Sequence, residues 1–203
     1  MFWADVWRGV KKKMTEHAKL KMCHEDRRIQ EKEQLDILLS HMSVATVCMY
    51  DEPYPYAVAM NYGYEWGEDD KLVLFFHMAK EGHRLELLRK NPKVSISMYE
   101  FLDRRGFSEY RKEQHDYRSI HAYGTAEIIT TEQKEEFLHG MSLILQNNGR
   151  PPAKRLAGEM KTRLYVLRVK ADFVTAKAQY PVTDRGELSM PPNQKKQEKE
   201  PEK

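Results

Sequence analysis

The stretch that decides the fold is residues 72–92, LVLFFHMAKEGHRLELLRKNP, because its pattern changes from strand to helix along its length. Residues 72–76 form a continuous apolar run rich in β-forming side chains, which is typical of a strand buried on both faces. Gly82 permits a turn at no steric cost, and residues 82–91 then follow helical spacing until Pro92 prevents continuation. The stretch therefore predicts a strand that turns over a glycine into a short helix.

Four polar side chains gather between this strand and the start of the helix: His77, Lys80, His83 and Arg84. Free N–H groups and the positive end of the helix dipole attract anions at a helix start. Arg84 can hold a phosphate with two parallel hydrogen bonds, which a lysine cannot do. The spacing therefore indicates an anion-binding turn, although a solvated helix start with scattered basic residues would give the same pattern.

The composition describes one soluble domain of ordinary size. The chain has 203 residues, of which 40% are hydrophobic and 32% charged, and its net charge is only +3. So small a net charge argues against a dedicated nucleic-acid binder, and no apolar run approaches the roughly 20 residues of a membrane helix. Its two cysteines, Cys23 and Cys48, form neither a disulfide framework nor a CxxC metal site. We therefore expect a cytoplasmic protein that does not span a membrane or bind nucleic acid.

The distribution of apolar and charged residues divides the chain into regions. Residues 1–21 are amphipathic, and we expect them to dock on the domain or on a partner subunit, with binding to a membrane surface as the alternative. Residues 22–183 form the main domain, in which the charge-dense segment 103–116 is expected to be an exposed loop. From residue 184 the composition is dominated by Lys, Glu, Gln and Pro, which predicts a disordered charged tail over 184–203.

The main domain has the pattern of short strands joined by tight turns, with flanking helices. Further strands are predicted over 44–50, 56–62, 93–101, 117–130 and 164–176, and further helices over 30–42 and 130–146. Gly63 with residues 66–70 predicts a polar turn between strands. Gly124 predicts a bulge, and Thr130 with Gln133 predicts a capping box. The predicted fold class is mainly β with flanking helices (α+β), with the antiparallel strands closed into a small split barrel.

Four stretches carry a family resemblance: HEDRRI at 24–29, PYAVAMNYGYE at 55–65, FFHMAKEGHRLELLRKNPKVSISM at 75–98 and YRSIHAYGTAEII at 117–129. In this order and spacing they resemble the FMN-binding split-barrel superfamily of pyridoxamine 5′-phosphate oxidase, and within it the nitroimidazole-resistance (nitroimidazole reductase)-like branch. The third stretch is the most specific, because it is similar to the family pattern Phe-His-Ser-Ala-x-Glu-Gly-x-Lys-Leu with its following Asn-Pro.

The resemblance implies that FMN is held at the interface of a homodimer. The basic residues beside the helix start would meet the flavin phosphate, the residues of strand 56–62 would lie along the isoalloxazine ring, and His77 would be the catalytic residue beside the flavin. The implied cofactor-binding residues are Met60, Asn61, Tyr62, His77, Met78, Lys80, His83, Arg84, Arg118 and Ser119.

The resemblance implies an oxidoreductase that reduces a small electrophilic, nitroaromatic-like substrate with electrons from a reduced nicotinamide or another donor. Non-catalytic flavin binding or sensing and haem binding remain alternatives. His77 and His121 could meet across a barrel and hold a haem or a metal, although no pair of histidines has the spacing of a zinc site, so no metal is expected. His77 could also be a core histidine bonded to a backbone carbonyl. Cys48 is expected to be a packed core thiol, and Cys23 to be exposed and inert.

Overall fold

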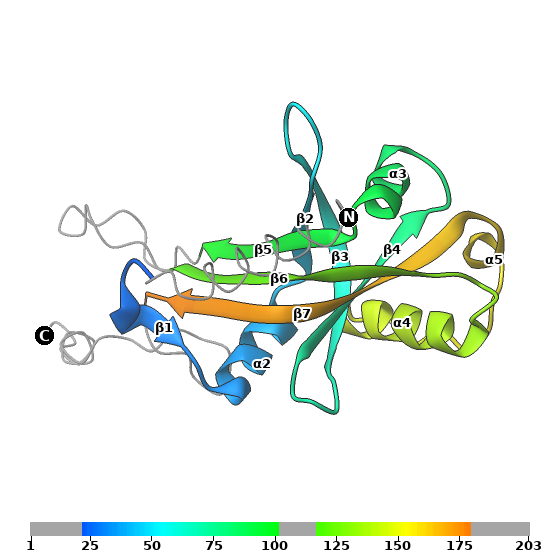
Figure 1. The fold of residues 1–203 in the computed structure, drawn as a ribbon. Helices are drawn as coiled ribbons and strands as arrows, with labels where there is room; N and C mark the ends of the chain where they lie inside the picture. Colours follow the sequence, from blue (N-terminus) through cyan, green and yellow to red (C-terminus); the bar gives the residue numbers. More distant parts are fainter. Residues whose placement is uncertain (1–21, 102–116, 180–203) are drawn as a thin grey trace, which may run out of the picture.

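The chain folds into a closed barrel of six antiparallel strands with helices on its flanks (Figure 1). The structure is a computed structural model that describes residues 22–101 and 117–179. The predictions made for residues 1–21, 103–116 and 184–203 therefore lie outside the described residues.

Helices and strands are interspersed along the described part of the chain. The helices are η1 (Glu25–Arg27), α2 (Lys32–His41), α3 (His83–Lys90), α4 (Lys134–Asn147) and α5 (Glu159–Arg163). The strands are β1 (Arg28–Ile29), β2 (Val44–Met49), β3 (Tyr56–Trp66), β4 (Leu72–Ala79), β5 (Lys93–Phe101), β6 (Tyr117–Ile129) and β7 (Leu164–Ala178).

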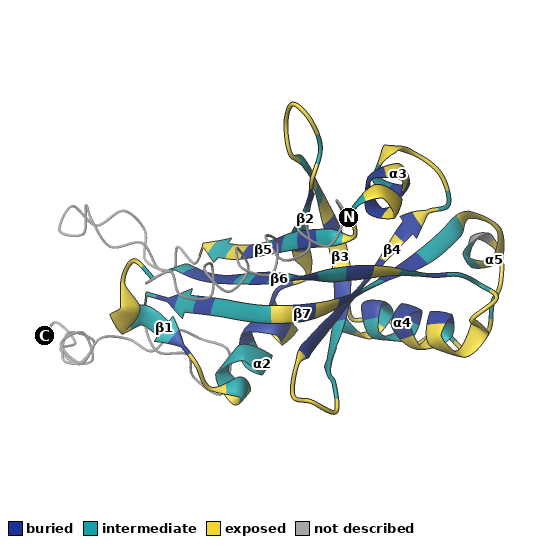
Figure 2. Ribbon diagram, in the orientation of Figure 1, coloured by how far each residue is buried: buried dark blue, intermediate teal, exposed yellow. Residues whose placement is uncertain are grey.

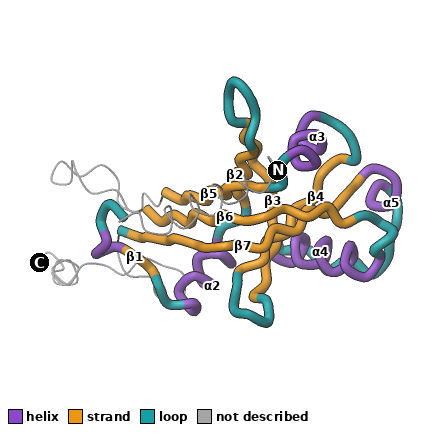
Figure 3. Tube along the Cα trace, in the orientation of Figure 1, coloured by secondary structure: helices purple, strands orange, loops and turns teal. Residues whose placement is uncertain are grey.

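The barrel closes because β7 pairs with β6 as well as with β4. The strand order is β1-β7-β4-β3-β2-β5-β6, and the additional pairing of β7 with β6 joins the two ends, leaving the short β1 attached outside the ring. Figure 3 shows the helices, in purple, at the periphery of these strands. The predicted split-barrel fold class is thus confirmed. Among the described residues, no helix is long and apolar enough to cross a membrane.

Strand β4 is buried on both faces because two hydrophobic cores meet at it. Leu74 and Phe76 point into the barrel interior, whereas Val73 and Phe75 pack under α4 in a second core. Figure 2 shows the strand in dark blue over most of its length. His77 is the next residue on the α4 side and is exposed, so the strand leaves the second core at this position.

The prediction for Gly63 is wrong, because this glycine lies inside β3 and not in a turn. A Cβ at Gly63 would lie 2.3 Å from both the Ile144 nitrogen and the Leu143 carbonyl carbon of α4. The glycine therefore lets the helix backbone approach the strand closely. The turn itself is formed by residues 67–71, in which the Gly67 amide donates to the Lys71 carbonyl at 2.9 Å.

The predictions at Gly124 and Thr130 have different outcomes. The bulge at Gly124 is confirmed by a shift of the β6–β7 register between Tyr123 and Gly124. Thr130 is not the N-cap of α4, which begins at Lys134 after Gln133. The Gln133 side chain accepts from the Thr130 amide at 3.2 Å, so the two residues shape the turn before the helix. The short elements η1, β1 and α5 had no periodic pattern long enough to predict them.

Candidate functional site

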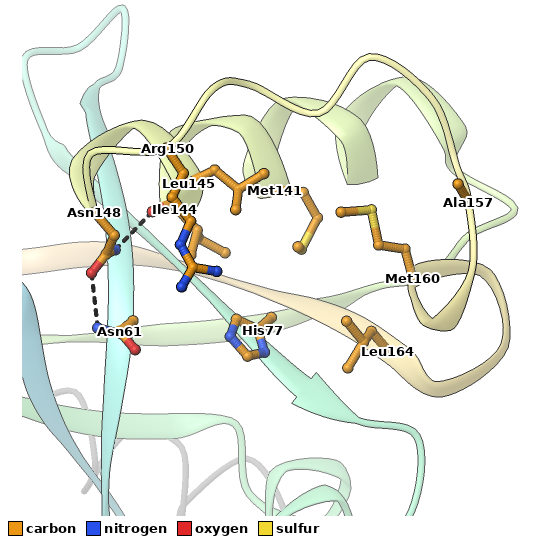
Figure 4. A pocket seen from close by; sticks show the side chains of 10 residues that line it. All are labelled: Asn61, His77, Met141, Ile144, Leu145, Asn148, Arg150, Ala157, Met160 and Leu164. Carbon is orange, nitrogen blue, oxygen red and sulfur yellow. Dashed lines mark hydrogen bonds between the residues drawn. The ribbon is translucent and has the colours of Figure 1, made fainter.

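A cleft of about 540 Å³ lies between the outer side of β3 and β4 and the helix α4 with the segment that follows it (Figure 4). This volume is typical of a small-molecule pocket. The apolar lining residues come from α4 and from the chain between α4 and β7: Met141, Ile144, Leu145, Ala157, Met160 and Leu164. The polar lining residues are Asn61, His77, Asn148 and Arg150.

Asn61 and His77 lie side by side because of the register between β3 and β4. Tyr62 is paired with Phe76 in this ladder, and both side chains point into the barrel. The next pair outward along the strands is Asn61 and His77, and alternation places both on the opposite side, facing α4. Two predicted site residues that are 16 positions apart in the sequence are therefore neighbours in the cleft.

A set of asparagine amides ties β3 to the end of α4. Asn148 donates from its Nδ2 to the carbonyls of Ile144, at 2.7 Å, and Tyr62, at 3.3 Å, while its Oδ1 accepts from the Asn61 Nδ2 at 2.8 Å. The Asn61 Nδ2 also donates to the Ser43 carbonyl at 3.1 Å. Because backbone carbonyls only accept, these contacts determine the orientation of both amides. Asn61 therefore presents its Oδ1, an acceptor, as its remaining polar atom.

His77 is held as a neutral imidazole at neutral pH. Its partial burial in the cleft lowers its pKa below the ordinary value, and the positive charge of Arg84 lowers this pKa further. A neutral imidazole has one nitrogen that donates and one that accepts a hydrogen bond. Among the described residues, neither ring nitrogen has a hydrogen-bond partner, so both are available to a ligand in the cleft.

Arg150 and Asn148 line the cleft but were not singled out in the sequence. Arg150 directly follows Gly149, whose φ of 68° turns the chain at the end of α4, and its amide donates to the Leu145 carbonyl at 2.9 Å. This turn directs the guanidinium toward His77, as Figure 4 shows. The pattern Asn-Asn-Gly-Arg-Pro-Pro at 147–152 indicates a helix end, and nothing in it indicates the strand that the helix end faces.

The two basic side chains at the start of α3, His83 and Arg84, differ in their hydrogen-bond partners. Gly82 precedes the helix with a φ of 104°, which confirms the glycine turn predicted at this position. The His83 Nε2 lies 2.7 Å from the Asp51 Oδ2, and this hydrogen bond lowers the pKa of Asp51. Arg84, which is half-buried, makes its hydrogen bond to the Met60 sulfur at 3.1 Å, a weak acceptor. Among the described residues, Arg84 therefore has no carboxylate partner.

Three of the predicted cofactor-binding residues have side chains in the barrel core. Met60, Tyr62 and Met78 are all buried in the interior cluster. The Tyr62 hydroxyl donates to the Leu39 carbonyl of α2 at 2.7 Å, and burial raises the pKa of this tyrosine. The side chains of these three residues therefore pack in the core and do not line the cleft.

Lys80 lies beside the loop around α5 instead of at the start of α3. Its Nζ donates to the Lys161 carbonyl at 3.1 Å, and the ammonium lies 5.3 Å from the centre of the Tyr165 ring. The lysine therefore contributes to holding the segment that forms one wall of the cleft.

Arg118 and Ser119 lie at the other end of the barrel. Arg118 is buried and paired with Glu100, and the Ser119 hydroxyl is buried without a hydrogen-bond partner among the described residues. Gly124, six residues further along β6, pairs with Val94 at the end of β5 nearer to α3. At about 3.3 Å per residue, this places Arg118 roughly 20 Å from that end. Within one chain, the predicted set of site residues is therefore split.

His77 and His121 do not meet across the barrel, so the alternative of a haem or metal held by this pair within one chain is not supported. His77 is paired with Val166 of β7 and His121 with Thr175 of the same strand, so about 30 Å of strand separates them. In the part of the chain that the structure describes, no three His, Cys, Asp or Glu side chains form a group that could hold a metal ion. Cys48 is half-buried and Cys23 is exposed.

The comparison with protein families identifies the chain. The family model described as pyridoxamine 5′-phosphate oxidase matches residues 31–178, which include the whole closed barrel. The chain belongs to this family. The resemblance found in the sequence is thereby confirmed at the family level. No curated protein matches the chain.

Members of the pyridoxamine 5′-phosphate oxidase fold with solved structures superpose on the barrel. One, from Bacteroides thetaiotaomicron, has a name that proposes 5-nitroimidazole antibiotic resistance; it is 23% identical, with 74% of this chain and 86% of that chain covered and a TM-score of 0.57. An FAD and heme binding protein from Mycobacterium smegmatis is 19% identical, with 75% and 73% covered and a TM-score of 0.55. An FAD-binding protein from Mesorhizobium loti is 17% identical, with 75% and 96% covered and a TM-score of 0.53. At these identities the similarity establishes the shared fold.

Proposed function

We propose that this member of the pyridoxamine 5′-phosphate oxidase family is an FMN-binding oxidoreductase that reduces a small, electrophilic, nitroaromatic-like substrate. The observation that carries the proposal is Arg84, which is half-buried at the start of α3, has no carboxylate partner among the described residues, and acts by its positive charge on His77 in the cleft. Solved structures of the same fold are named as FAD-binding or as an FAD and heme binding protein, which supports a flavin in this fold.

The residues present fit a flavin phosphate at the start of α3. The turn at Gly82 leaves open space beside it, since a Cβ placed there would meet nothing within 4 Å. Helix-start amides and a guanidinium are the groups that bind a phosphate. Arg84 is the anchor in this proposal, and His83 is the weaker contributor because Asp51 already balances it.

The flavin ring would lie along the ends of β3 and β4. The Asn61 Oδ1 offers an acceptor to an N–H group of the ring, and backbone groups of Met60 and Tyr62 lie on the same strand. A bound flavin supplies hydride or electron transfer, and the protein positions the substrate and excludes water. His77 would hydrogen-bond the substrate beside the ring without adding a charge.

A second copy of the chain would complete the site. Arg118 and Ser119, whose hydroxyl has no partner in the described part of the chain, lie at the opposite end of the barrel from Arg84, too far away for a flavin bound at α3 of the same chain. In a homodimer these residues can reach the flavin of the other copy. The oligomeric state, measured by mass photometry with and without FMN, tests this part of the proposal.

The first experiment is an absorption spectrum of the purified protein before and after addition of FMN and desalting. We expect retained flavin bands in the wild type and a loss of at least about tenfold in FMN affinity in Arg84→Ala, because a charge-assisted phosphate contact is removed. The matched control is Arg89→Ala, which removes an exposed arginine from the last turn of the same helix.

Each other outcome of this experiment has a defined meaning. Full FMN occupancy in Arg84→Ala would exclude Arg84 as the phosphate anchor. Preferential retention of FAD over FMN in parallel titrations would identify FAD as the cofactor. A Soret band in the spectrum would identify haem as the ligand. Flavin retention without turnover in the presence of excess reduced nicotinamide would favour a flavin-binding or flavin-sensing role.

A further inference from the structure

The cleft under α4 is divided into a polar and an apolar end. Figure 4 shows Asn61, His77 and the Arg150 guanidinium together at one end, with Met141, Met160 and Leu164 at the other. None of the lining residues carries a carboxylate. The site therefore has the charge pattern of a pocket for an apolar molecule with a negatively charged head.

Two of the polar side chains at this end, His77 and Arg150, make no hydrogen bond to any described residue. Arg150 is exposed, and among the described residues its guanidinium has no hydrogen bond or ion pair. By contrast, both polar side-chain atoms of Asn148 form hydrogen bonds that hold β3 to α4. Arg150 is thus a cation held at the mouth of a cleft by a rigid turn, with five donors that no described residue accepts.

We propose that the cleft binds a flat apolar molecule bearing an oxyanion, and that Arg150 receives this oxyanion and sets the preference for acidic over neutral substrates. The apolar body would lie against the two methionines, whose flexible side chains adapt to different shapes. The identity of this molecule as the substrate rests on the proposed function; its binding in the cleft does not.

The flavin phosphate is the other possible source of an oxyanion at Arg150. Arg150 lies on the α4 side of His77, whereas Arg84 approaches from α3 and contacts Met60. We therefore assign the cofactor phosphate to Arg84 and the ligand oxyanion to Arg150. The two assignments predict different effects of the two arginine variants on FMN and on an acidic ligand.

The test is isothermal titration calorimetry of the full-length protein, with and without FMN, using 4-nitrobenzoate and its neutral analogue 4-nitrobenzamide. We expect the wild type to prefer the benzoate, and Arg150→Met to weaken benzoate binding by about tenfold while leaving the benzamide and FMN unaffected. Arg150→Lys should retain part of the preference. The control is Arg155→Met, an exposed arginine of the same segment that does not line the cleft.

Four results would overturn the assignment. Equal binding of the two probes by the wild type, or absence of binding, would show that the cleft does not select an oxyanion. Unchanged benzoate binding in Arg150→Met would remove this arginine from the site. Weakened FMN binding in Arg150→Met would assign it to the cofactor phosphate. If the protein rejects flavin but still prefers the benzoate through Arg150, the proposed function fails and this inference stands.

Discussion

At the scale of single residues, neighbouring basic side chains differ in whether their charge is available. His83 and Arg84 are adjacent and both belong to the first turn of α3, but His83 is hydrogen-bonded to Asp51. Arg84 keeps a permanent charge, and within residues 22–101 and 117–179 its side chain bonds only the Met60 sulfur. The two neighbouring basic residues are therefore not equivalent as ligands for an anion, and Arg84 is the stronger candidate.

Substitution of His77 tests whether this residue acts in substrate reduction and not in flavin binding. We expect His77→Ala to retain FMN but to reduce turnover of a nitroaromatic substrate by about tenfold or more, because a hydrogen bond to the reacting molecule is lost. The measurement is steady-state reduction with flavin occupancy checked by absorbance. His139→Ala is the control, since His139 is an exposed histidine of α4 bonded to Glu65 and outside the cleft lining. Turnover equal to that of the wild type would refute the role of His77.

At the scale of elements, the candidate site depends on how closely α4 approaches β3. The contact is made by backbone against backbone at Gly63, and the asparagines at the end of the helix continue it. Since the cleft lies where this contact ends, displacement of the helix would alter the distance between Arg150 and His77.

Gly63→Ala tests this packing directly. A methyl group at 2.3 Å from two backbone atoms of α4 cannot be accommodated by a side-chain movement, so the helix must shift. We expect the free energy of unfolding to fall by about 2–3 kcal/mol, at the upper end of overpacking effects. Urea unfolding measures this change. In the control, Gly67→Ala, the nearest atom belongs to the Asp69 side chain at 3.2 Å, so a much smaller loss is expected; equal losses would contradict the explanation.

At the scale of the whole molecule, the closed barrel holds His77 and His121 apart, although the sequence allows that they meet. β7 pairs with both β4 and β6, and it carries the partners of His77 and His121 near its two ends. Burial lowers the pKa of both histidines, with Arg84 adding to the effect at His77 and Lys177 at His121. Two separate parts of the barrel therefore resist protonation in the folded state.

This resistance makes global stability depend on pH. As the pH falls below the ordinary histidine value of about 6.5, the unfolded chain binds protons before the folded one, so the free energy of unfolding decreases. We expect a larger decrease between pH 7 and pH 5 in the wild type than in His77→Gln, measured by urea unfolding. Between pH 7 and pH 8 the two proteins should show nearly the same change, because His77 is mostly neutral in both states there. An identical decrease between pH 7 and pH 5 would contradict the lowered pKa of His77.

Much of the fold follows from local pattern. The strand at β4, the glycine turn at Gly82, the limits of β5 and the bulge at Gly124 were all predicted from residue type and spacing, and the structure confirms them. The reason is that strand alternation, helical spacing and the conformational freedom of glycine act over a few neighbouring residues. Gly63 shows the limit, since its role depends on a helix 80 residues later in the chain.

The sequence by itself determined the family, the barrel and the basic residues around Gly82, because these depend on short-range patterns and on motifs in order. Only the tertiary structure placed Arg150 opposite His77, paired His83 with Asp51, and set Arg118 and Ser119 at the far end. Strand register and the path of α4 decide these relations. They arise from long-range pairing and packing, in which a shift of one residue moves a side chain to the other face of the sheet.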